Sequence, residues 1–105
     1  MRDFRELKVW EKAHQVTLAV YKATRSFPRE ELYGLTSQIR DASSSVPSNI
    51  AEGCGRGSAA ELEYRLLLAR DLAYLDRSEY QTLSPQVIEV KRMLGTFIAK
   101  IRSGN

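Results

Sequence analysis

The sequence contains very few of the residues that build metal sites, disulfides or nucleophilic centres: among its 105 residues are one cysteine, Cys54, and one histidine, His14. A single cysteine excludes an intrachain disulfide and is typical of a cytoplasmic protein. One cysteine and one histidine do not suffice for the usual zinc site. A Cys54–His14 nucleophile and base would require two distant segments to meet. We therefore expect no metal, no cofactor and no enzymatic activity.

Long apolar runs are also missing. No run approaches the ~20 residues that a membrane-spanning helix needs. The first four residues, Met1–Phe4, are charged and lack the apolar core of a signal sequence. Hydrophobic residues make up 43% and charged residues 28% of the chain, a globular composition. We expect a single cytoplasmic domain over residues 1–105 with no membrane contact.

A strong excess of charge of one sign is absent as well, since the net charge is +3. The excess lies in the outer segments: residues 1–28 carry six basic against three acidic residues, and residues 76–105 carry five against three. Such mild basicity permits contact with RNA or DNA without requiring it, and a solvated surface of mixed charge is the simpler interpretation. The candidate nucleic-acid contacts are Arg5, Lys8, Lys12, Lys22, Lys91, Arg92, Lys100 and Arg102.

Four stretches repeat apolar residues at steps of three and four, which is typical of amphipathic helices, and no segment has a convincing strand pattern. A capping box at Asp76–Glu79 marks the start of the last helix, and Ser58–Glu61 fits a second box with Ser58 as N-cap. Short connections between four helices predict an all-α, antiparallel, up-down-up-down bundle. The expected helices cover residues 9–27, 30–52 or 35–52, 58–75 and 76–101.

Two prolines lie inside expected helices. Pro47 costs the second helix ~3 kcal/mol, because it removes a backbone donor and crowds the preceding turn. We expect the serines just before it to bond the freed carbonyls, and the packing of Val46 and Ile50 to contribute more. Pro85 predicts a kink or a broken first turn in the fourth helix. The third helix has a wide apolar face, which predicts burial on two sides, as in an oligomer.

Several motifs closely resemble those of a four-helix-bundle family, the 23S rRNA-intervening sequence proteins. The resemblance covers nearly the whole chain, and its most specific part runs from Tyr33 to Gly53. The motifs are Phe4–Trp10 (FRELKVW), Ala13–His14, Phe27–Pro28, Glu31–Arg40 (ELYGLTSQIR), Val46–Gly53 (VPSNIAEG), Leu66–Leu72 (LLLARDL) and Arg92–Leu94.

The resemblance implies a bundle that assembles into a ring of five subunits. A related branch, the accessory variability determinants of diversity-generating retroelements, resembles a basic pentamer that binds reverse transcriptase and nucleic acid. Five copies of +3 would give a ring of +15. The resemblance supplies no catalytic residues, and for most members no biochemical function is assigned.

The chain departs from this family in length. Members usually carry roughly a dozen more residues after the glycine-rich turn, over three helical turns at ~1.5 Å per residue. Here Ser58 is followed directly by Ala59. Either the third helix is truly shorter, or residues are missing from the sequence between these two positions. Cys54, where the family tends to have an aromatic residue, and Pro85 are further departures.

The second helix and the loop after it carry polar candidates for a subunit interface or a binding groove. The glycine-rich loop Gly53–Ser58 precedes a helix, where free N–H groups attract anions. It lacks the preceding strand and the lysine of a nucleotide-binding loop, so we interpret it as a helix connection, with phosphate affinity as the alternative. The candidates are Arg40, Ser48, Asn49, Glu52 and Arg56.

Three functional hypotheses follow. The first is a non-enzymatic homo-oligomer that serves as a nucleic-acid-associated accessory or scaffold. The second is a protein-interaction adaptor that binds no nucleic acid and uses the third helix and the proline-containing second helix. The third, a small enzyme that uses Glu52, Asn49 or Cys54, ranks last, because no acid–base pair or metal set supports it.

Overall fold

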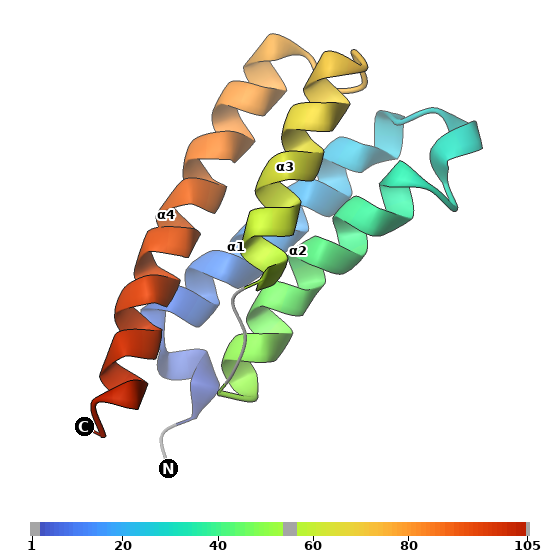
Figure 1. Cartoon of the computed structure of the whole chain (residues 1–105). Coiled ribbons are helices and arrows are strands. Elements are labelled where there is room, and N and C mark those ends of the chain that lie inside the picture. Colours follow the sequence, from blue (N-terminus) through green and yellow to red (C-terminus); the bar gives the residue numbers. More distant parts are fainter. Residues whose placement is uncertain (1–2, 54–56, 105) are drawn as a thin grey trace.

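The computed structural model of the chain describes residues 3–53 and 57–104, and within these ranges all regular structure is helical (Figure 1). Short 3-10 turns precede the first α-helix and connect it to the second. The α-helices are α1 (Lys8–Ala23), α2 (Leu35–Ala51), α3 (Gly57–Asp71) and α4 (Arg77–Arg102). The 3-10 turns are η1 (Phe4–Glu6), η2 (Thr24–Ser26) and η3 (Arg29–Glu31).

The four helices form one bundle of 45 × 22 × 19 Å. Helix α1 packs against α2 and α4, and α3 packs against the same two helices. The colour order in Figure 1 shows that successive helices run in alternating directions. The predicted all-α, up-down-up-down bundle is thus confirmed.

The core consists of the apolar stripe that each helix turns inward. Val20 of α1, Ile39 of α2 and Leu66 of α3 are completely buried, and Val87 of α4 is 1% exposed. These residues recur at the helical spacing that the sequence shows, so burial of one face holds each helix in the bundle. The outward side of α3 remains open in the single chain, where Tyr64 is 60% exposed.

Pro47 lies buried inside α2, and the helix continues through it. The carbonyl that loses its helical donor belongs to Ser43, four residues earlier. That carbonyl accepts a hydrogen bond of 2.8 Å from the hydroxyl of Thr17 on α1. The hydroxyls of Ser43, Ser44 and Ser45 donate instead to carbonyls of residues 40 and 41. The prediction that the local serines satisfy the freed carbonyl was therefore wrong, because a neighbouring helix supplies the donor.

The helix starts agree with the sequence at α4 and differ at α3. Asp76 accepts a hydrogen bond of 2.7 Å from the Glu79 backbone, and Glu79 accepts one of 3.2 Å from the Asp76 backbone, as the capping box predicts. Helix α3 begins at Gly57, so Ser58 is a helical residue and not the N-cap that we expected. Helix α4 runs unbroken through Pro85, so the alternative of a broken first turn was wrong.

The helices differ greatly in length. The 15 residues of α3 span about 22 Å, whereas the 26 residues of α4 span about 39 Å. In Figure 1 the first turn of α3 lies partway along the bundle, above the ends of α2 and α4. One end of the bundle is thus built from η1, the last turn of α2 and the last turns of α4, and this arrangement opens a groove there.

Candidate functional site

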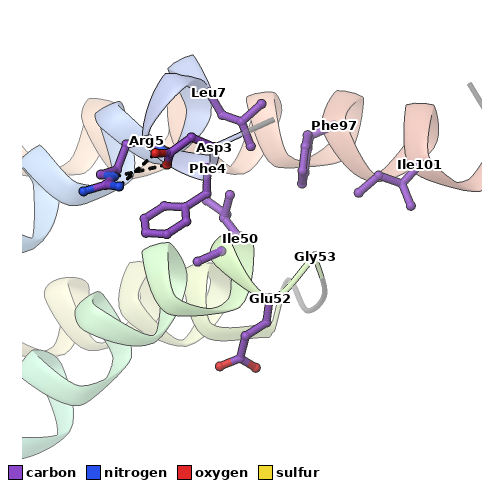
Figure 2. Close-up of a pocket in the computed structure, with 10 residues that line it drawn as sticks. Asp3, Phe4, Arg5, Leu7, Ile50, Glu52, Gly53, Phe97 and Ile101 are labelled. Atoms are coloured by element: carbon purple, nitrogen blue, oxygen red, sulfur yellow. Dashed lines mark hydrogen bonds and ion pairs between the residues drawn. The ribbon is translucent and has the colours of Figure 1, made fainter. Parts of the chain in front are cut away.

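The groove at this end of the bundle has a volume of about 580 Å³ (Figure 2). Its apolar residues come from three separate elements: Phe4 and Leu7 at the start of the chain, Ile50 on α2, and Phe97 and Ile101 on α4. Because Phe97 is half-buried and Ile101 is 46% exposed, the apolar lining is open to solvent. The surface is suited to covering by another apolar group.

Local contacts hold the amino-terminal wall of this groove in place. The ring of Phe4 packs edge-on against Trp10, with 5.2 Å between the ring centroids. Asp3 caps η1 by accepting from the Arg5 backbone at 2.9 Å, and it also pairs with the Arg5 guanidinium at 2.8 Å. This hydrogen-bonded guanidinium lowers the pKa of the Asp3 carboxyl. Arg5 is therefore engaged with its own neighbour rather than free for a ligand.

The polar residues predicted on α2 are not brought together at this groove. Glu52 follows the last residue of α2 and lines the groove, but in Figure 2 its carboxylate points away from Phe97 and Ile101. Ser48 is exposed, and Asn49 donates a long hydrogen bond of 3.4 Å to the Ser58 hydroxyl.

Arg40, another residue of the predicted set, lies far from this groove. Arg40 sits twelve residues before Glu52, about 18 Å away along the helix axis. Its Nε donates to the Thr24 hydroxyl at 2.8 Å, and its guanidinium lies 5.0 Å from the centroid of the Tyr21 ring. Arg56 falls outside the described residues.

The predicted nucleic-acid contacts divide into paired and unpaired side chains. Lys91 pairs with Glu63 of α3 at 2.6 Å, and Arg92 pairs with Glu89. The bonded Arg92 lowers the pKa of Glu89. Together with Arg5, three of the eight predicted contacts are thus neutralised by carboxylates. In the described part of the chain, the remaining five have no ion pair: Lys8, Lys12, Lys22, Lys100 and Arg102.

These five residues, called the basic set below, lie on adjacent helices because α1 packs against α4. Lys12 is close enough to Glu89 of α4 to contribute to the lowered pKa of that carboxyl. Lys22 lines a hollow together with Glu79 and Thr82 of α4. At least part of the basic set therefore follows the seam between α1 and α4.

Of the remaining pair of candidates, His14 and Cys54, the structure describes only His14. His14 is exposed and stacks on Trp10 with 5.0 Å between ring centroids, a packing role on the surface of α1. Cys54 lies outside the described residues, so the pair that it would form with His14 is not placed. Among residues 3–53 and 57–104, no group of three acidic, histidine or cysteine side chains is positioned to hold a metal ion.

Within those same residues, no helix combines the length and apolarity needed to cross a bilayer.

Fold and surfaces together define a class of protein: an antiparallel four-helix bundle with an open apolar groove and cations along one helix seam. Residues 5–58, just over half of the chain, match the family model of the 23S rRNA-intervening sequence proteins. The chain therefore belongs to this family, as its motifs predicted. The match ends at Ser58. No curated protein matches the chain.

Sequence reasoning missed the apolar groove, although one signal for it was present. The expected third helix was much shorter than the fourth, so part of the bundle had to lack a wall. The lining residues Phe4, Leu7 and Phe97 give no signal of their own, because core-facing and groove-facing positions have the same spacing along a helix.

Proposed function

We propose that this protein is a non-enzymatic bundle that assembles with itself and binds the backbone of RNA or DNA as an accessory or scaffold. The observation that supports the proposal is the basic set, five cations on two adjacent helices that form no ion pair within the described residues. Such cations release counterions from nucleic acid, and self-assembly multiplies their number. A cytoplasmic location and a reverse transcriptase as partner are parts of this proposal.

We expect binding with little sequence preference. Contacts to phosphate groups fix the position of the protein on a nucleic acid but do not distinguish its bases. Sequence-independent binding to single strands usually also involves bases that stack on aromatic side chains. On α1, Trp10 is already engaged by Phe4 and His14, and Tyr21 is covered by Arg40. These contacts occupy part of each ring's surface, which reduces the area left for stacking on a base.

The test is a salt titration of RNA and DNA binding, followed by fluorescence anisotropy. A Lys8→Gln, Lys12→Gln, Lys22→Gln variant should bind more weakly, and its log–log salt slope should fall by about two to three. A variant with Arg65→Gln, Arg70→Gln and Arg77→Gln has the same net charge and serves as the control. Absence of binding at low salt in the folded protein, or equal weakening in the control, would overturn the proposal.

The groove at the open end favours a second candidate function, a protein-interaction adaptor. Its apolar lining, bounded by η1, α2 and α4, suits an amphipathic helix laid into a hydrophobic groove. Ile101→Glu should abolish capture of a protein partner from nuclease-treated lysate. Ile88→Glu on the same helix provides the control, since Ile88 is 50% and Ile101 46% exposed. Capture that neither substitution weakens would count against the groove.

A further inference from the structure

A second cavity, of about 370 Å³, lies at the opposite end of α2, between the end of α1 and the turn η3. Three arginines line it: Arg25 from η2, Arg29 from η3 and Arg40 from α2. In the described part of the chain, none of the three forms an ion pair with a carboxylate. Three cations around one cavity repel each other unless an anion lies between them.

The acidic residues of this region face another direction. Glu31 accepts a hydrogen bond of 3.1 Å from the Leu35 backbone and one of 2.9 Å from the Tyr74 hydroxyl. The hydrogen-bonded Glu31 carboxylate raises the pKa of the Tyr74 phenol, so this carboxylate is engaged on the Tyr74 side of η3. No carboxylate is among the residues that line the cavity.

Thr36 also lines this cavity, and its hydroxyl is buried without a partner among the described residues. Thr36, in the first turn of α2, is only 3% exposed, and within the described residues its Oγ1 has no hydrogen-bond partner. An unpaired buried hydroxyl is costly, so a native protein that retains one usually gives it a ligand or a water molecule. The other buried threonine of the cavity, Thr24, already donates to the Val20 carbonyl and accepts from Arg40.

The guanidinium of Arg40 is held in one orientation by contacts within the protein. Its Nε is committed to Thr24 at 2.8 Å, and its guanidinium lies over Tyr21. These contacts hold the plane of the guanidinium, and its two terminal nitrogens form no hydrogen bond within the described residues. A guanidinium held in this way needs little further ordering to make paired hydrogen bonds to an oxyanion.

We propose that this arginine cavity is a binding site for a phosphate group, with Arg40 as the fixed donor, Thr36 as the buried hydroxyl donor, and Arg25 and Arg29 as outer cations. Arginine forks match phosphate oxygens in charge and geometry. The first turn of α2 also contributes backbone N–H groups, whose partial positive charge attracts an anion as the arginines do. The proposal is independent of nucleic-acid binding through the basic set, because the two share no residue.

The experiment titrates the full chain with inorganic phosphate at constant ionic strength and follows backbone amide shifts by NMR. Binding should saturate and should shift the amides around Thr36 and Arg40. Arg29→Gln, at an exposed position that folding tolerates, should weaken binding about tenfold, the effect of one charge-assisted hydrogen bond. Thr36→Val should weaken it severalfold. Arg77→Gln is the control, because it removes an exposed arginine outside the cavity.

Two further arms identify the source of the phosphate. If a 5′-phosphorylated oligonucleotide binds more tightly than its unphosphorylated counterpart, and Arg29→Gln removes the difference, the site takes the end of a nucleic acid. If inorganic phosphate binds and the terminal phosphate adds nothing, the site takes a small phosphorylated molecule. Shifts that do not saturate, or equal weakening by Arg77→Gln, would overturn the proposal. The Lys8, Lys12, Lys22 variant should bind phosphate as the natural chain does, which separates this result from the proposed function.

Discussion

At the scale of single residues, Pro47 leaves the Ser43 carbonyl without its helical donor, and the Thr17 hydroxyl of α1 takes over that role at 2.8 Å. The same hydroxyl lies 3.1 Å from the Ala13 carbonyl of its own helix, the longer of the two contacts. Thr17 and Ser43 are both buried, so water does not provide a replacement. The proline and the threonine should therefore depend on each other.

We predict that Thr17→Val destabilises the protein by about 1–3 kcal/mol, because it leaves a buried carbonyl unpaired. In a Pro47→Ala background the restored N–H can bond Ser43, so the cost of Thr17→Val should fall by about 1 kcal/mol or more. Urea unfolding of the four variants measures this coupling. Thr82→Val, which removes an exposed hydroxyl bond on α4, should change stability by less than about 0.5 kcal/mol. Additive effects of Thr17→Val and Pro47→Ala would contradict the interpretation.

A second prediction at this scale concerns Thr36. Because its hydroxyl is buried without a partner among the described residues, Thr36→Val should raise the free energy of unfolding by about 1 kcal/mol in phosphate-free buffer. The same substitution should reduce the stabilisation that added phosphate gives. Thermal unfolding with and without phosphate measures both effects. A variant that is less stable than the natural chain in phosphate-free buffer would show that the hydroxyl already has a structural partner.

At the scale of the helices, two positions carry residues that their backbone does not favour. Ala73, just after α3, has a φ of 65°, in the left-handed region that favours glycine. Its N–H bonds the Arg70 carbonyl and the next N–H bonds Ala69, the pattern of a Schellman motif. Gly95, by contrast, sits exposed inside α4, where an added Cβ would meet no atom within 4 Å. Glycine would suit the left-handed backbone at position 73, and alanine would suit the helical backbone at position 95.

We expect Gly95→Ala and Ala73→Gly each to raise the free energy of unfolding, by roughly 0.5–1 kcal/mol. Gly53→Ala is the matched control: it adds the same methyl group at a φ of 75° and should cost about 1 kcal/mol. Denaturant midpoints measure all three. Stabilisation by Gly53→Ala would show that backbone conformation does not determine these effects.

Most of the helices were predictable from sequence because their signals are local, although the start of α3 and the effect of Pro85 were not predicted correctly. Features that depend on contacts between helices were missed. The capping box of α4 was predicted correctly, since Asp76 and Glu79 satisfy each other within one turn. The donor for the Ser43 carbonyl was not, because Thr17 is adjacent to it only once α1 packs on α2. The arginine cavity was missed for the same reason, since Arg25 and Arg29 resemble ordinary surface charges until η2 and η3 place them beside Arg40.

At the scale of the whole molecule, large apolar side chains remain exposed on several sides of the bundle. On the outward side of α3, Tyr64 is 60% exposed, and just after the helix Leu72 is 46% exposed. The wide apolar face of this helix, noted from its sequence, is thus only partly buried by the chain itself. A second copy of the chain is the covering that our proposed function requires.

We predict that light scattering at micromolar concentration gives a mass that is a multiple of the 11.9 kDa chain. Tyr64→Lys combined with Leu72→Lys should lower that mass, because both substitutions place a charge on apolar surface that a second copy would cover. Circular dichroism should show that the variant remains helical. Ile88→Lys, at a similarly exposed position on α4, should leave the mass unchanged. A monomeric natural chain would contradict the assembly.

The unequal lengths of α3 and α4 determine which part of the bundle unfolds locally most easily. The last turns of α4 extend past the start of α3, so fewer neighbouring side chains hold them in place (Figure 1). Amide hydrogens there should exchange with deuterium through local openings, whereas those near Val87 should exchange only when the whole domain unfolds. The end of the bundle that carries the groove should therefore be less stable than the middle. A segment that docks in the groove would slow amide exchange in the last turns of α4 and leave exchange near Val87 unchanged.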